Sequence, residues 1–361
     1  MRTYLDHNAT SPLLPAVKAA MLHAMEVGGN ASSIHAEGRA AHKIVDDARE
    51  ALGFALGCLP QMIVFTGSGS EANNMALRGV GAERILVSSI EHPSVLAAAK
   101  ASGKTVDLIP VTRDGVVDLA ALDNMLSGPN VLVSVMLANN ETGVIQPIAD
   151  VVRIAKAKGA LVHVDAVQGF GKIPLNFGLL GCDLLTVAAH KVGGPVGIGA
   201  LVVREGLVVE PLIVGGGQEL RRRAGTENLA AIAGFAAVAK ENRLQTNVLR
   251  QQLEASLEGA IVVGTDAERL PNTTCFAMPG MKAETLVMNF DLEGVAVSSG
   301  SACSSGKVSQ SHVLEAMGLG TEISSAAIRV SLGWNTTHAD VQHFSTIWNK
   351  LLVRHAARKA A

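Results

Sequence analysis

Short apolar segments alternate with helix-length segments through the middle of the chain. The apolar segments from residue 62 onward are 62–66, 84–90, 105–111, 131–137, 161–166, 183–188 and 199–203. Strands separated by helix-length segments are typical of βαβ units, in which a mostly parallel sheet lies between layers of helices. Residues 12–26 and 36–57 precede these units and carry apolar side chains at helical spacing. The pattern predicts an α/β fold.

The C-terminal part, 259–361, changes to an α+β pattern. Strands are expected at 260–264, 272–278, 294–299 and 326–332, with helices at 283–290 and 339–352. A long amphipathic helix over about 227–258 is expected to connect this part to the sheet. Because 361 residues suit two unequal domains, we expect a large domain over 12–245. A smaller α+β domain is expected to consist of 1–11 and 246–361.

Composition narrows the class of protein. Hydrophobic residues make up 48% of the chain and aromatic residues 3%, so the core is mostly aliphatic. The 30 basic and 32 acidic residues are nearly balanced, which argues against a nucleic-acid-binding surface or a polybasic anchor. The apolar run around 229–239 is too short to span a bilayer. The N-terminal MRTYLDHNAT has no apolar signal segment. We expect a soluble cytoplasmic protein that binds neither nucleic acid nor membrane.

The four cysteines lie far apart and form no CxxC pair. Their spacing argues against a disulfide framework and against a zinc site, so we expect no metal and a reducing compartment. Cys58, Cys182 and Cys275 are interpreted as buried small hydrophobes. Cys303 differs because it lies in SSGSACSSGKVSQSH (298–312), a stretch rich in serine and glycine. An exposed thiol there would suit nucleophilic attack.

Polar residues follow several of the expected strands. Gly69 and Ser70 lie in GSGSEANN (67–74), where a turn that opens a helix would offer backbone N–H groups to a phosphate; such turns are also common without a ligand. His92 and Asn140 follow two further strands and could equally be structural. Asp165 directly follows a buried strand, so its carboxylate needs a partner. That partner could be a protonated pyridine nitrogen, an arginine or a helix N-terminus.

Lys191 lies between an apolar strand and a glycine-rich turn, in LLTVAAHKVGGPVGIGAL (184–201). An exposed loop is the ordinary place for such a lysine. A buried ammonium would be costly unless it is paired or converted, for example to a Schiff base. In a parallel sheet, ligands bind beyond the carboxyl ends of the strands. A phosphate turn, a histidine, an aspartate and a lysine at such ends match the requirements of pyridoxal phosphate (PLP).

Two further segments allow two interpretations each. YLDHNATSP (4–12) ends in polar residues, including Asn8, that could line a site, or it could form a helix N-cap at Thr10 or Ser11. GGGQELRRRAGTEN (215–228) contains three consecutive arginines. It could be a solvated loop, or it could reach the phosphate of a neighbouring subunit.

With these segments together, the chain resembles the NifS/IscS-type cysteine desulfurases, a family of fold-type I, class-V aminotransferase-like PLP enzymes. The resemblance runs from YLDHNAT to the C-terminal helix. It includes FTGSGSEANN, EHPSV, NNETG, HVDAVQ, AHKVGGPVGIGAL, GGGQELRRRAGTEN, SSGSACSSG and IRVSLG in the family's order. It implies an aspartate-aminotransferase-like architecture, with a large PLP-binding domain and a smaller α+β domain.

The resemblance also implies roles for individual residues. Lys191 would bind the PLP aldehyde and move the substrate Cα proton, and Cys303 would accept sulfur. His92 would stack on the ring and take part in acid–base steps. The remaining implied contacts are with the ring (Asp165 and Gln168), with the phosphate (Gly69, Ser70, His190 and, from the partner subunit, Thr226) and with the substrate carboxylate (Asn140 and Arg329). Asn8 is a further candidate for substrate binding. Ala188 stands where the family usually has a serine that touches the phosphate, and Val196 where it often has lysine.

The implied activity is the PLP-dependent removal of sulfur from L-cysteine. The products would be L-alanine and a persulfide on Cys303, which would pass its sulfur to an iron–sulfur scaffold or another acceptor. A homodimer is implied as well. The alternatives are a selenocysteine lyase or an aminotransferase, which would not need Cys303, and a non-catalytic PLP-bound scaffold.

Overall fold

A computed structural model describes residues 2–241, 246–300 and 310–360 of the chain. In this part, seven strands form the largest sheet, in the order β2-β8-β7-β6-β5-β3-β4. Strands β3 to β7 run parallel to one another, and β8 is antiparallel to β2 and β7. Their bounds are β2 (Ile63–Thr66), β3 (Arg84–Ser88), β4 (Thr105–Ile109), β5 (Val131–Ser134), β6 (Leu161–Asp165), β7 (Leu184–Ala188) and β8 (Gly199–Val203). These strands confirm the predicted, mostly parallel sheet.

Helices cover both faces of this sheet, because successive side chains of each strand point to opposite faces. Ile63 and Phe65 pack in one core with α2, α6 and α8, whereas Val64 packs in another with α3 and α4. The helices are α1 (Pro15–Val27), α2 (Ala36–Leu56), α3 (Gly69–Gly79), α4 (Pro93–Lys100), α5 (Leu119–Met125), α6 (Ile148–Ala157), α7 (Phe177–Leu180) and α8 (Leu229–Ala239). Short 3-10 turns lie at η1 (Pro60–Met62), η2 (His190–Val192) and η3 (Glu219–Arg221). The α/β prediction is confirmed.

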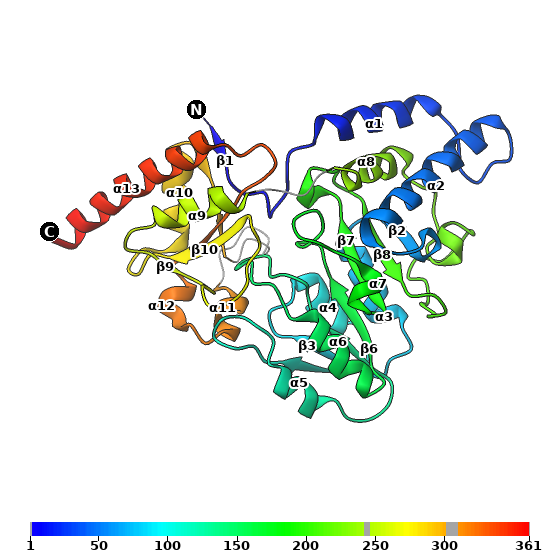
Figure 1. The fold of residues 1–361 in the computed structure, drawn as a ribbon, viewed down its shortest axis with the longest axis horizontal. Helices are drawn as coiled ribbons and strands as arrows, with labels where there is room; N and C mark the ends of the chain where they lie inside the picture. The colour runs from blue at the N-terminus through cyan, green and yellow to red at the C-terminus, as the bar shows by residue number, and fades with distance from the viewer. Residues whose placement is uncertain (1, 242–245, 301–309, 361) are drawn as a thin grey trace.

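The C-terminal part builds a second, antiparallel sheet in the order β12-β13-β10-β9. Its strands are β9 (Ile261–Val262), β10 (Thr273–Ala277), β12 (Ser298–Ser299) and β13 (Ala327–Ser331), with β11 (Val295–Ala296) beside them in the chain. The helices are α9 (Asn247–Ala255), α10 (Ala283–Leu292), α11 (His312–Ala316), α12 (Gly320–Ser324) and α13 (His338–Ala360). Figure 1 shows these elements grouped beside the large sheet. The domain limits at residues 11/12 and 245/246 stay a prediction.

The N-terminal segment connects the two sheets. Strand β1 (Thr3–Tyr4) pairs with β11, and Leu5 packs in the C-terminal core. Further along, Ser11 N donates to His190 O at 2.8 Å and Leu14 N donates to Gly193 O at 3.0 Å. In Figure 1 this segment runs from β1 across to α1. Residues 7–9 form a turn, but the alternative of a helix N-cap at Thr10 or Ser11 is wrong, because α1 begins only at Pro15 and Leu14 is its N-cap residue.

The single helix expected over about 227–258 is also wrong. Helix α8 ends at Ala239, where Lys240 N bonds the carbonyls of Ala237 and Val238, and α9 begins only at Asn247. The two helices have different neighbours: α8 packs on α1 and α2, and α9 on α13 and β10. The two helices therefore pack on different hydrophobic cores.

The described cysteines lie in apolar surroundings. Cys182 and Cys275 are buried, and half-buried Cys58 packs at the edge of the core. Burial raises the pKa of the Cys58 thiol to about 11 and the pKa of each of the other two to about 12, so they stay protonated near neutrality. Cys303 lies outside the described residues. Across the described ranges, no helix combines the length and apolar character needed to cross a membrane.

Candidate functional site

A cavity of about 240 Å³ opens at the carboxyl ends of the large sheet's parallel strands. Most of the predicted site residues line it: Asn8, Gly69, Ser70, His92, Asn140, Asp165, Gln168, His190, Lys191 and Arg329. Ala188 lines it as well. Of the remaining two predicted residues, Thr226 lies elsewhere and Cys303 is outside the described residues. The structure therefore brings these ten together, and their roles stay predictions.

One wall of the cavity is the start of α3. Ser68 caps this helix by accepting a hydrogen bond from Glu71 N at 3.1 Å. The next residues, Gly69 and Ser70, stand in the first turn, where backbone N–H groups have no partner within the helix. Gly199 allows the close approach of β8, since a Cβ there would lie 2.6 Å from the Ser68 carbonyl carbon. The arrangement can hold an anion against the positive end of the helix dipole.

Asp165 ends β6 with a buried carboxylate. Its Oδ2 accepts a hydrogen bond from Asn73 Nδ2 at 2.8 Å, and its Oδ1 accepts one from Val167 N at 3.0 Å. Asn73 also donates to Ser94 Oγ at 2.9 Å. Sequence reasoning missed Asn73, although it stands one helical turn after Gly69 and Ser70 and so shares their face of α3.

His92 lines the cavity and also caps α4. Its Nδ1 accepts a hydrogen bond from Ser94 N at 3.1 Å, so the neutral ring carries its proton on Nε2. Burial lowers the pKa of His92, the Asp165 carboxylate opposes this effect, and Lys191 and His312 lower the pKa further. His92 thus combines a structural contact, the cap of α4, with a place in the cavity wall.

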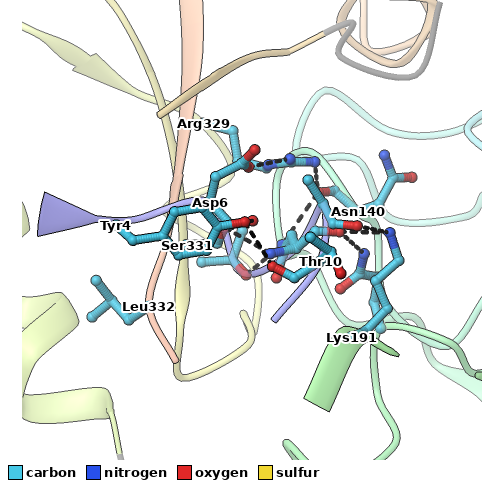
Figure 2. A network of polar contacts seen from close by, with 12 residues as sticks. Tyr4, Asp6, Thr10, Asn140, Lys191, Arg329, Ser331 and Leu332 are labelled. Atoms are coloured by element: carbon cyan, nitrogen blue, oxygen red, sulfur yellow. Dashed lines mark hydrogen bonds and ion pairs between the residues drawn. The ribbon is translucent and has the colours of Figure 1, made fainter. Parts of the chain in front are cut away.

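Lys191 belongs to the η2 turn that follows β7 and is not an exposed loop residue. Its Nζ donates hydrogen bonds to Asn8 O and Ala9 O, each at 2.8 Å. Figure 2 shows its side chain reaching the polar network from one side, with Asp6 on the other. The preceding residue, His190, contacts Thr10 Oγ1 through Nδ1 at 3.3 Å. Burial, with help from Lys191, lowers the pKa of His190 to about 4, so it is neutral at pH 7.

Arg329 projects from β13 and is 1% exposed. Its Nη2 forms an ion pair with Asp6 Oδ1 at 2.7 Å, and its Nη1 donates to Asn140 O at 3.0 Å (Figure 2). Within the described part of the chain, its buried Nε has no hydrogen-bond partner. Arg329 also lines the cavity, so its positive charge can attract an anionic ligand there. Sequence reasoning missed Asp6, because nothing in the local pattern around it indicates a partner more than 300 residues away.

Gln168 and Asn8 meet at the base of the cavity. Gln168 Nε2 donates to Asn8 O at 3.1 Å, and Asn8 Nδ2 donates to Thr273 Oγ1 at 2.9 Å. A second lysine, Lys172, donates to the side-chain oxygens of both residues. Sequence reasoning missed Lys172 too; its position four residues after Gln168 was the available signal.

Thr226 lines a separate hollow with Glu219 and Arg223. Arg223 forms an ion pair with Glu71 at 2.9 Å, and buried Glu219 forms one with Arg49 at 2.7 Å. Two polar side chains of the 215–228 segment thus form ion pairs with residues of the same chain. Val196, the second departure from the family pattern, is 71% exposed.

Comparison with known proteins identifies the family. The aminotransferase class-V family model matches residues 3–344. A cysteine desulfurase IscS of Dictyoglomus turgidum is 38% identical, over 97% of this chain and 94% of its own length. A cysteine desulfurase of a Nostoc species is 40% identical, over 97% and 93%.

Solved structures agree with this assignment. A NifS-like protein from Rickettsia africae superposes with a TM-score of 0.91 at 36% identity, covering 98% of this chain and 99% of that one. The apo structure of a cysteine desulfurase from Thermococcus onnurineus gives 0.86 at 25% identity, covering 97% and 94%. The chain belongs to the class-V aminotransferase family and, within it, to the PLP-dependent NifS/IscS-type cysteine desulfurases.

Proposed function

We propose that this chain transfers sulfur from L-cysteine to Cys303, releasing L-alanine and leaving a persulfide. The substrate C–S bond breaks and an S–S bond forms to the Cys303 sulfur. The electron pair of the broken bond stays on the substrate Cβ, which takes up the proton that the Cys303 thiol gives up. The observation that carries the proposal is the cavity itself. It combines Lys191, Asp165, the start of α3 and Arg329 in one chain of this family.

The residues present fit PLP, which when bound supplies an electron sink for bond breaking at the substrate Cα. Asp165 is held by neutral donors, so it can pair with a pyridinium nitrogen. Gly69 keeps space in front of the helix start, since a Cβ there would lie 3.1 Å from Val167 Cγ2. The first turn of α3 and His190 would hold the phosphate, and Lys191 would hold the aldehyde.

Two further side chains would contact the ring of the cofactor. His92 would stack on it, and Gln168 would donate to its phenolic oxygen. Ala188 lines the same cavity with a methyl group in place of a hydroxyl, so the phosphate would have one donor fewer than is usual in the family.

Arg329, Asn140 and Asn8 would bind the substrate carboxylate. All three line the cavity. The positive charge of Arg329 attracts an anionic carboxylate, and its buried Nε has no hydrogen-bond partner among the described residues. The Asp6 carboxylate and the Asn140 carbonyl fix the other two nitrogens of the guanidinium. This anchoring orients the arginine before the substrate arrives.

Lys191 would move the Cα proton through Nζ. Asn8 O and Ala9 O hold that nitrogen at the edge of the cavity. His92 would exchange a second proton at Nε2, because Nδ1 is engaged by Ser94. Its lowered pKa keeps the ring neutral at pH 7. In the neutral ring, Nε2 carries the proton that it can donate.

The residues that flank 301–309 support the role of Cys303. Ser311 Oγ donates to Glu141 Oε2 at 2.5 Å, and a Cβ at Gly300 would lie 3.2 Å from the same oxygen. The chain therefore enters and leaves this segment beside Glu141, whose neighbour Asn140 lines the cavity. Both ends of the segment that contains Cys303 are therefore held close to a residue whose neighbour lines the cavity.

The test is to incubate purified enzyme with L-cysteine and to quantify alanine, keto acid and protein-bound sulfur. Wild type should form alanine and gain one sulfur on Cys303 by peptide mass. Cys303→Ser should form neither alanine nor persulfide while still binding PLP, and the half-buried Cys58→Ser serves as the matched control. Keto acid in place of alanine would establish an aminotransferase. Bound PLP with no product would establish a scaffold.

We also propose that the enzyme is a cytoplasmic homodimer in which Thr226 of one subunit contacts the phosphate in the other. The support is that Thr226 lines a hollow separate from the cavity of its own chain. Sedimentation should give twice the chain mass of 37.3 kDa. Thr226→Ala should weaken PLP binding in the homodimer by up to about tenfold, and mixed dimers of Lys191→Ala and Thr226→Ala chains should regain wild-type affinity at the one site that keeps both residues. An iron–sulfur scaffold is the proposed sulfur acceptor.

A further inference from the structure

Lys172 is a buried lysine behind the cavity wall. It is 2% exposed and lies in the turn that follows β6, where its backbone N donates to Gly169 O at 3.0 Å. Its Nζ donates to Gln168 Oε1 at 2.6 Å and to Asn8 Oδ1 at 2.7 Å. Both acceptors are neutral amide oxygens. A buried lysine that binds only neutral groups gains little stability from the arrangement, which suggests a role in the site.

The chemistry of the amine determines how the Gln168 amide is turned. A lysine directed at a side-chain amide through its N–H groups must meet the oxygen and not the nitrogen. Gln168 Oε1 therefore faces Lys172, and Nε2 is turned to the side of Asn8 O and the cavity. Asn8 Oδ1 has a second donor, Asn272 Nδ2 at 3.2 Å. In the described part of the chain, Gln168 Oε1 has Lys172 alone.

We propose that Lys172 is a positioning residue that makes Gln168 an obligatory N–H donor to the ligand in the cavity. A flipped amide would present its oxygen, which would repel an anionic ligand atom. The longer bond from Nε2 to Asn8 O favours the same orientation as Lys172 does. The inference rests on the proposed function, in which that atom is the phenolic oxygen of PLP. It adds a residue that touches neither cofactor nor substrate but fixes one that does.

The electrostatic surroundings agree with this donor role. The charged and titratable groups near Lys172 are Lys191, Arg329, His7 and His190, with Asp6 paired to Arg329. Burial and then the Lys191 and Arg329 charges lower the pKa of Lys172 well below its usual range. A neutral amine still has two N–H groups, one for each amide oxygen. The ammonium, which has no lone pair, excludes the flipped amide, whereas the neutral amine only favours the observed orientation, which satisfies both amide oxygens at once.

The experiment measures how well the apoenzyme distinguishes PLP from 3-deoxypyridoxal phosphate, which lacks the phenolic oxygen. Dissociation constants are obtained by equilibrium dialysis for wild type, Lys172→Met, Gln168→Ala and the double variant. Wild type should prefer PLP by about tenfold, the worth of one well-aligned hydrogen bond. Lys172→Met should reduce this preference to that of Gln168→Ala, and the double variant should show no further loss.

A lysine elsewhere provides a matched control. Lys104 also donates to two neutral oxygens, Leu77 O and Val80 O, so Lys104→Met should keep the tenfold preference. If Lys172→Met loses affinity equally for both ligands, Lys172 is merely structural and the proposal is overturned. If Lys172→Met does not fold, Lys172→Gln decides: an amide N–H in place of the amine should retain part of the preference, and a complete loss would overturn the proposal.

Turnover separates this inference from the proposed function. Wild-type enzyme that forms alanine, together with an unchanged preference in Lys172→Met, would refute only the role of Lys172. Wild-type enzyme that forms no alanine would refute the proposed function, and the binding preference would still report on Lys172.

Discussion

Glu141 allows a quantitative prediction because its carboxyl is buried beside the cavity. It is 3% exposed and accepts a hydrogen bond from the Ser311 hydroxyl. Burial raises its pKa from 4.5 to about 7, against the opposing effects of Ser311 and Arg329. The group is therefore half-protonated near neutrality in the folded chain. The unfolded chain, in which water surrounds the carboxyl, releases the proton at its ordinary pKa.

The sign of the effect follows from proton linkage. Well below pH 4.5 the carboxyl is protonated in both states, and it contributes no pH dependence. Between pH 4.5 and 7 the unfolded chain releases the proton before the folded chain does, so the free energy of unfolding falls as the pH rises. One pKa unit corresponds to about 1.36 kcal/mol, so the total loss above pH 7 is about 3 kcal/mol.

The perturbation is Glu141→Gln, which keeps an oxygen for Ser311 but cannot ionise. The variant should exceed wild type in unfolding free energy by about 3 kcal/mol at pH 8 and by less than about 1 kcal/mol at pH 4.5. Urea unfolding of the apoenzyme at both pH values measures the difference. Exposed Glu284→Gln controls for the chemical change itself. A difference between Glu141→Gln and wild type that is the same at both pH values would refute the reasoning.

Three further changes test other contacts. Asn73→Ala removes a 2.8 Å donor from Asp165 and should weaken PLP binding about tenfold, because a hydrogen bond to a charged group is worth about 1.5 kcal/mol or more; an unchanged dissociation constant would contradict this role. Gly199→Ala would place a methyl group 2.6 Å from the Ser68 carbonyl carbon. The displaced α3 start should raise the PLP dissociation constant by about tenfold or more, and wild-type binding would show that the strand can yield. Phe290→Ala removes a ring stacked 4.9 Å from Phe344 and should lower the unfolding free energy by about 3–5 kcal/mol in urea titrations, with PLP affinity retained; a loss of affinity would show that the C-terminal core shapes the site.

The strand-end residues of the site could be predicted because the topology of a parallel sheet fixes where its strands end. Once the apolar segments are recognised as a parallel sheet, the residues that follow them must meet at one edge. Asp165 and His92 lie at that edge for this reason, and so does Lys191. The amphipathic helices of the first sixty residues were predictable in the same way.

Other contacts depend on tertiary packing that a local pattern does not contain. Asp6 finds Arg329 only because β1 pairs beside β11, and the wrong helix over 227–258 spans two segments that follow different cores. The sequence around Lys172 does not indicate a buried lysine, because its partners are amides and one of them is 164 residues away. The departure at Ala188 is visible in the sequence, but its neighbours are known only from the fold.

The N-terminal segment also bears on how the protein is made. Thr3 pairs with Val295, so the first strand leaves the ribosome long before its partner exists. At synthesis rates of about 5–20 residues per second, the delay is roughly 15–60 s. The large sheet, complete at Val203, can form during this time and present the helix start and Lys191. Asp6 meets Arg329, and Asn8 gains its contacts with Asn272 and Thr273, only when the last third of the chain arrives. The part of the site assigned to the cofactor therefore matures before the part assigned to the substrate.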